Sequence, residues 1–138
     1  MDDPQKDEAL PQPVTAPLPH DVRAPTLARC FLHQNRDGLP QALIENAELL
    51  TSELVTNAVL HGQPPIAMEL AVTPTTLDVA IDDGGPNLPV LDTSAVSGTQ
   101  PHGRGLQIVD TIANQWGVQK GPRGNGKRVW FRLFARSS

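Results

Sequence analysis

The 138-residue sequence has one cysteine, no tyrosine, and no apolar run of the roughly 18 residues that a membrane-spanning helix needs. A single cysteine excludes an intrachain disulfide framework and a cysteine-rich zinc site. Charge is modest, because 11 Lys and Arg residues against 15 Asp and Glu residues give a net charge of -4. No general attraction to nucleic acid or to an anionic membrane follows from that balance. The N-terminus lacks the apolar stretch of a signal peptide. We therefore expect a cytoplasmic protein without direct nucleic-acid or membrane partners.

The first 25 residues differ in composition from the rest of the chain. They hold six of the 14 prolines, and five acidic residues against two basic ones. A proline-rich acidic segment with few large apolar residues buries too little surface to offset the entropy of ordering it. We predict that residues 1–20 form a disordered leader and that residues 21–138 form one domain, long enough for a two-layer core.

Hydrophobic periodicity predicts three helices: one over residues 26–35, a long one from residue 43 that Gly62, Pro64 and Pro65 end, and one over 105–116 that Gly117 ends. In the long middle helix, apolar residues recur at three- and four-residue spacing and form one stripe, and Thr51 falls outside that stripe. The positions of the stripe are Leu43, Ile44, Ala47, Leu50, Leu54, Val55 and Ala58.

Alternating apolar and polar residues predict strands over 66–72, 77–83 and 129–134, and leave room for one more near 117–120. The first two strands are separated by a short turn, which indicates a hairpin. Residues 84–103 are rich in Gly, Pro, Ser and Thr without periodicity, which is typical of a lid or binding loop. The order of elements predicts an α+β fold: a two-layer sandwich with three helices on one face of a mixed, mostly antiparallel sheet.

Three polar patterns are candidates for chemistry. The first is Glu53 and Asn57 on the long helix, where a spacing of four places both side chains on one helix face. A carboxylate can orient or deprotonate a hydroxyl group, and an amide oxygen can ligate Mg²⁺. Taken alone, such a pair is more often two polar residues that happen to be neighbours on a helix surface and have no function.

The second pattern is the run Asp82-Asp83-Gly84-Gly85-Pro86 at the end of a predicted strand. Glycines there let the backbone approach a flat ligand closely, and a carboxylate can accept a hydrogen bond from an exocyclic amine such as that of adenine. The same residues are also typical of a simple hairpin turn.

The third pattern is the run His102-Gly103-Arg104-Gly105-Leu106, which opens the last predicted helix. Free backbone amides and the positive end of the helix dipole favour an anion, and Arg104 adds a charged fork that suits phosphate. A plain helix-capping loop would use similar residues.

Together, and in this order, the three patterns resemble the GHKL ATP-binding superfamily of histidine kinases, gyrase-type and mismatch-repair ATPases and heat-shock chaperones. The finer wording is most similar to actinobacterial anti-sigma factor serine/threonine kinases, over about residues 20–135. The matching words are Glu53-Leu54-Val55-Thr56-Asn57-Ala58 with His61-Gly62, Asp83-Gly84-Gly85-Pro86, Gly103-Arg104-Gly105-Leu106 with Ile108-Val109, and Trp116-Gly117-Val118.

The resemblance implies a role for each matching residue. Glu53 would be the general base or hydroxyl-orienting acid and Asn57 the Mg²⁺ ligand. Asp83 would contact adenine, with Gly85 beside the base. The phosphates would lie against the opening of the last helix, at Gly103, Arg104, Gly105 and Leu106, with residues 87–102 as the lid.

Two positions depart from the family pattern. Asn87 stands where the second glycine of Asp-x-Gly-x-Gly is expected in the frame of Asp83. The frame of Asp82 also lacks that glycine, and the phase of the preceding strand favours Asp83. The late Gly-x-Thr of larger relatives falls at Gly126-Lys127-Arg128, so Arg128 replaces the threonine.

The resemblance therefore implies an ATP- and Mg²⁺-binding anti-sigma factor that phosphorylates a Ser or Thr of an anti-anti-sigma antagonist. It also implies a sigma factor as partner and a homodimer formed through the sheet face. The alternative, which Asn87 and Arg128 favour, is a binding module that uses ATP only as a switching ligand, without transfer.

The segment Gly121–Arg128 nearly spells a P-loop, but Arg128 replaces its hydroxyl residue and a strand pattern follows where a helix is required. Residues 120–136 carry six bases and no acid, which we interpret as a solvated hairpin and not as a nucleic-acid surface.

Overall fold

The computed structural model describes residues 13–36, 38–85, 103–122 and 126–135. Within these ranges the chain forms β1 (Val14–Leu18), α2 (Ala24–Gln34), α3 (Gln41–His61), β2 (Ile66–Val72), β3 (Thr76–Asp83), α5 (Gly103–Ile112), β4 (Gln115–Lys120) and β5 (Lys127–Phe134).

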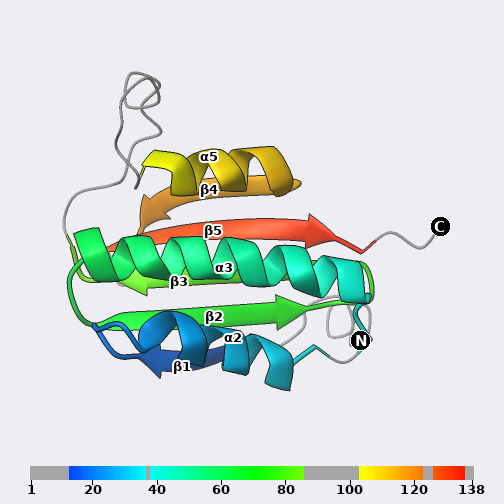
Figure 1. Ribbon diagram of the computed structural model, residues 1–138, viewed down its shortest axis with the longest axis horizontal. Coiled ribbons are helices and arrows are strands. Elements are labelled where there is room, and N and C mark those ends of the chain that lie inside the picture. Colours follow the sequence, from blue (N-terminus) through cyan, green and yellow to red (C-terminus); the bar gives the residue numbers. More distant parts are fainter. Residues whose placement is uncertain (1–12, 37, 86–102, 123–125, 136–138) are drawn as a thin grey trace, which may run out of the picture.

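The strands form one open sheet in the order β1-β2-β3-β5-β4. Every pairing between the described strands is antiparallel, so the sheet is not mixed. The three helices of the described ranges lie on one face of the sheet, with α3 across its centre, α2 over the β1 side and α5 beside β4 (Figure 1). The predicted two-layer α+β sandwich is confirmed, and the β2–β3 hairpin is present as expected.

The core fills the space between the sheet and α3. All seven residues of the predicted apolar stripe on α3 are buried, and all of them except Ile44 belong to one core cluster with the alternate apolar residues of β2, β3 and β5. Thr51 is the exception to the prediction, because it is fully buried where a polar-face position was expected. Its hydroxyl oxygen has no hydrogen-bond partner among the described residues.

Replacing Thr51 by valine is expected to raise the free energy of unfolding by about 1 kcal/mol. Valine has the same branched shape, and the substitution removes a buried hydroxyl that is desolvated without gaining a hydrogen bond. Urea denaturation of Thr51→Val measures the change, with Thr56→Val, at an exposed position of the same helix, as the control. A loss of stability in Thr51→Val alone would show that the hydroxyl is satisfied.

The predicted disordered leader is wrong for residues 14–18, which form β1. This strand pairs with β2 from Val14↔Leu70 to Leu18↔Ile66, and Leu18 is buried in the core. A strand at the edge of a sheet tolerates Pro17, because one side of its backbone has no ladder partner. The pairing with β2, which local composition does not encode, is what orders this segment. Residues 1–12 lie outside the described residues.

The last helix is shorter than predicted, since α5 ends at Ile112 and Trp116 belongs to β4. Asn114 separates the two elements: its backbone N–H donates to the carbonyl of Arg132, and its side-chain Oδ1 accepts from the N–H of Phe134. Trp116 then donates a hydrogen bond from Nε1 to Asp110 Oδ1 on the helix, at 2.8 Å. Because Asn114 is hydrogen-bonded to β5, the helix ends before it, although the helical period of the sequence continues to Trp116.

The other two helices agree more closely with the prediction. α2 begins at Ala24, two residues before the predicted start, because Pro25 fits the first helical turn. α3 ends at His61, and Gly62 caps it as predicted, through a hydrogen bond from its N–H to the carbonyl of Ala58.

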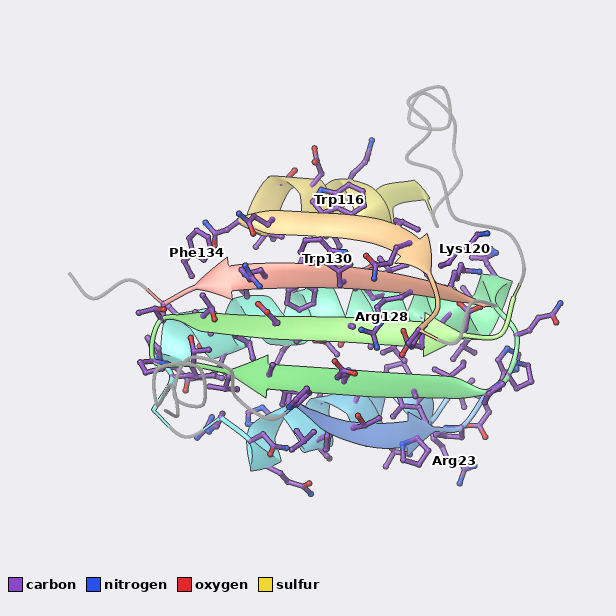
Figure 2. All side chains as sticks on the ribbon, turned by 180° about the vertical axis from the view of Figure 1, so that it is seen from behind. Arg23, Trp116, Lys120, Arg128, Trp130 and Phe134 are labelled. Atoms are coloured by element: carbon purple, nitrogen blue, oxygen red, sulfur yellow. The ribbon has the colours of Figure 1, made fainter. Side chains whose placement is uncertain are left out.

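The face of the sheet opposite the helices carries paired charges (Figure 2). Arg128 contacts Asp82 at 2.7 Å and Glu69 at 3.1 Å, and Arg132 contacts Asp78 at 2.7 Å. The side-chain hydrogen bonds to Asp82 raise the pKa of Arg128 above its ordinary value. These arginines of the basic C-terminal stretch are thus neutralised by acids of β2 and β3.

Among the described residues, no helix is long and apolar enough to cross a membrane.

Candidate functional site

The site forms where the C-terminal end of α3 meets the end of β3, at Asp83. This residue is the last of β3, and its side chain is 3% exposed. One carboxylate oxygen, Oδ1, accepts a hydrogen bond from the backbone N–H of Gly85 at 2.7 Å. In the described part of the chain, no hydrogen bond reaches the second oxygen, Oδ2. Asp83 therefore retains an acceptor in a mostly buried position.

Gly62 brings the end of α3 against this carboxylate. A Cβ atom on Gly62 would lie 2.5 Å from both Cγ and Oδ2 of Asp83, so a side chain here would displace the acid. The loop after Gly62 is fixed to the strand by a hydrogen bond from the N–H of Gly84 to the carbonyl of Gln63, at 2.7 Å. On the other side, His20 Nε2 lies 3.3 Å from the carbonyl oxygen of Gly62. The end of α3 and the end of β3 are thus held in contact.

Lys127 forms an ion pair with Asp83 that the sequence patterns did not predict. Its Nζ lies 3.3 Å from Asp83 Oδ1, and its side chain is 10% exposed. The two residues are register partners in the β3–β5 pairing. A Lys immediately after Gly126 was visible in the sequence, but only the register places it opposite Asp83.

Asp82 and Arg128 lie on the opposite face of the sheet and pair with each other there. The strand phase thus agrees with the preference for the frame of Asp83, because Asp83 and not Asp82 faces the helices. It also changes the interpretation of Arg128, which replaces the threonine of the late Gly-x-Thr motif. Since Arg128 turns away from Asp83, the residue of the late glycine motif that reaches the site is Lys127.

Glu53 and Asn57 project from α3 one helical turn apart, and both side chains are half-buried. Neither makes a side-chain hydrogen bond or ion pair within the described ranges. Asn57 precedes Gly62 by five residues, which is about 7.5 Å along the helix axis. Toward the described residues, both polar side chains are therefore without a partner, and they lie on the helix whose end contacts Asp83.

Helix α5 packs against α3 and starts at Gly103, two residues before the predicted start, so its first turn contains Gly103, Arg104, Gly105 and Leu106. The positions of their side chains, and the predicted lid over 87–102 with Asn87, lie outside the described residues.

These residues fit a nucleotide. Gly85 lies close to both charged groups, because a Cβ atom on it would be 3.0 Å from Asp83 Oδ1 and 3.2 Å from Lys127 Nζ, and a side chain there would press against them. The carboxylate of Asp83 can accept a hydrogen bond from a base, and the opening of α5 offers its amides to an anion. The described residues contain no cluster of three or more His, Cys, Asp and Glu side chains that could hold a metal. Asn57 could ligate Mg²⁺, which commonly keeps several waters and takes few protein ligands.

An antiparallel sheet covered on one face by helices, with a polar site at the end of its central helix, defines a two-layer α+β domain. Residues 17–133 match the family model described as histidine kinase-like ATPase domain. The chain therefore belongs to this family of GHKL-type ATP-binding domains. Its members typically bind ATP with Mg²⁺.

Solved structures support the same fold. The chain is similar to the histidine kinase domain of the blue-light activated histidine kinase from Erythrobacter litoralis EL346, with a TM-score of 0.53 and 20% sequence identity. The similarity covers 82% of this chain and 58% of that chain. No curated protein matches the sequence.

Proposed function

We propose that this protein is an ATP-dependent serine/threonine kinase of the anti-sigma type, which phosphorylates an anti-anti-sigma antagonist and sequesters a sigma factor in the cytoplasm. The observation that carries the proposal is the position of Glu53 and Asn57, half-buried without partners among the described residues, on the helix whose end contacts Asp83. ATP is the proposed ligand because the chain belongs to a family of ATP-binding domains. The regulatory partners come from the resemblance of the motifs.

In the proposed reaction Glu53 accepts the proton of the acceptor hydroxyl as its oxygen bonds to the γ-phosphorus. The bond from that phosphorus to the β–γ bridging oxygen breaks, and ADP leaves. Mg²⁺ neutralises phosphate charge when bound, and Asn57 would hold it. Asp83 fixes the base, so that the γ-phosphate lies at a constant distance from Glu53. Positioning and charge neutralisation supply most of the acceleration in phosphoryl transfer.

A homodimer belongs to the same proposal. The face of the sheet opposite the helices is free of helical cover from the described residues, which leaves it available to a second copy of the chain (Figure 2).

Replacing Glu53 by glutamine is expected to reduce phosphorylation of the antagonist by at least about 100-fold, because the general base is lost. ATP affinity should be unchanged, since the proposal assigns Glu53 to the transferred phosphate and not to the base. Transfer of labelled γ-phosphate to the anti-anti-sigma protein of the same operon measures the first quantity, and calorimetric titration measures the second.

Glu45→Gln is the matched control, because Glu45 is exposed on the same helix and accepts a hydrogen bond only from Gln41 among the described residues. If the wild-type protein binds ATP but labels no antagonist, the kinase proposal is wrong and the switching module takes its place.

A further inference from the structure

Lys127 is a buried cation that the proposed reaction does not use. Asp83 and Lys127 are the two charged residues among the buried polar residues of the described chain. Burying a lysine and an aspartate together removes much of their hydration, which costs free energy. Their attraction offsets that cost only when the geometry is good and further hydrogen bonds are made. Lys127 has three donors, and within the described ranges its ion-pair partner is Asp83. Among the described residues, its remaining donors have no other charged partner.

The backbone directs Lys127 to the same point as Asp83. Gly126 has a φ of +71° and lies so close to β3 that a Cβ atom on it would be 2.3 Å from the carbonyl oxygen of Asp83. The next residue, Lys127, enters β5 on the face of Val129 and Phe131, which is the face that the helices cover. Its ammonium group and the carboxylate of Asp83 both lie within 3.2 Å of the position that a Cβ atom on Gly85 would take. A base that contacts Asp83 would therefore meet a donor and an acceptor side by side.

We propose that Lys127 is a base-reading residue: it donates a hydrogen bond to N1 of adenine while Asp83 accepts from the 6-amino group. This inference rests on the proposed binding of ATP at Asp83. Adenine presents a donor at the amine and an acceptor at N1, adjacent on one edge. Asp83 offers acceptors only and Lys127 donors only, so the pair is complementary to that edge. Guanine presents an acceptor at O6 and a donor at N1, the reverse order, and would place O6 against the carboxylate.

The experiment compares nucleotides that differ by one atom or group, so that the wild-type protein itself gives the answer. Calorimetric titration gives the Kd for ATP, for 1-deaza-ATP, in which a C–H replaces N1, and for purine riboside triphosphate, which lacks the 6-amino group. We expect each analogue to bind the wild-type protein about tenfold or more weakly than ATP, because a hydrogen bond to a charged group is lost.

The variant Lys127→Met then assigns the N1 contact to its partner. We expect it to bind ATP and 1-deaza-ATP equally, because the donor is absent. Lys120→Met is the matched control, since Lys120 is the cross-strand partner of Lys127 on β4 and its side chain is exposed. This control removes the same charge and should keep the wild-type preference for ATP over 1-deaza-ATP.

Equal affinity of the wild-type protein for ATP and 1-deaza-ATP would overturn the inference and leave ATP binding intact. Lys127 would then serve only to neutralise Asp83. The inference is equally wrong if Lys127→Met keeps the preference for ATP. Absence of any ATP binding by the wild-type protein would overturn the proposed function as well. If Lys127→Met does not fold, the wild-type comparison still decides.

Discussion

The variant Asp83→Asn is expected to bind ATP about 10- to 100-fold more weakly than the wild-type protein. The carboxylate is nearly buried, and its Oδ2 receives no hydrogen bond from the described residues, so an amine of the base would find a charged acceptor there. Asparagine retains the shape but replaces one acceptor oxygen by an N–H₂ donor, which repels an amine. Calorimetric titration with ATP and Mg²⁺ measures the change in Kd.

Asp82→Asn is the control for this result. It removes the same charge from the adjacent residue of β3, but on the opposite face, where the partner is Arg128. We expect its ATP affinity to remain that of the wild-type protein. Asp83→Asn should also lower the free energy of unfolding, because it leaves the ammonium group of Lys127 buried without its counter-ion. The titration therefore belongs at a temperature where denaturation curves show the variant folded. Equal ATP affinity of the two variants would place the base elsewhere.

The variant Gly126→Ala is expected to lower the free energy of unfolding by about 3 kcal/mol or more and to weaken ATP binding with it. Two costs add at this position. The backbone φ of +71° is unfavourable for a residue with a side chain, and the new Cβ would lie 2.3 Å from the carbonyl oxygen of Asp83. Since that contact is with backbone, β5 must move away from β3 at the point where Lys127 meets Asp83. Urea denaturation and ATP titration measure the two effects.

Gly38→Ala separates the two costs. Gly38 has a φ of +83°, and nothing lies within 4 Å of a Cβ atom placed on it. Its replacement should therefore cost only the backbone conformation, about 1 kcal/mol, and should leave ATP affinity unchanged. If both glycine variants lose the same stability, close contact between Gly126 and Asp83 is not what requires glycine there.

Much of the fold could be predicted because its signals are local. The stripe on α3 and the alternation in β2 and β3 are repeated patterns that each element carries in its own sequence. The spacing of Glu53 and Asn57 is equally local, since one helical turn separates residues four apart. The phase of β3 likewise selected Asp83 over Asp82, because residues of a strand alternate between faces.

Other elements were mistaken because their partners are distant in the chain. Residues 14–18 resemble a leader in composition, and become a strand only through pairing with β2. Trp116 continues the helical period of the sequence, yet it belongs to β4, where it is the cross-strand partner of Phe131 on β5. Thr51 was assigned to the polar face because of its hydroxyl group, although its position on the helix points it into the core.

The sequence by itself determined the α+β class, the central helix and the residues of the three polar patterns, because short-range periodicity and turn chemistry encode them. Only the tertiary structure decided that Lys127 meets Asp83 and that Arg128 does not. Lys127 and Arg128 are adjacent in the chain, and a shift of one residue in a strand turns a side chain to the other face of the sheet. That choice depends on the register of β3 with β5, which joins residues more than forty positions apart and leaves no local mark in either strand.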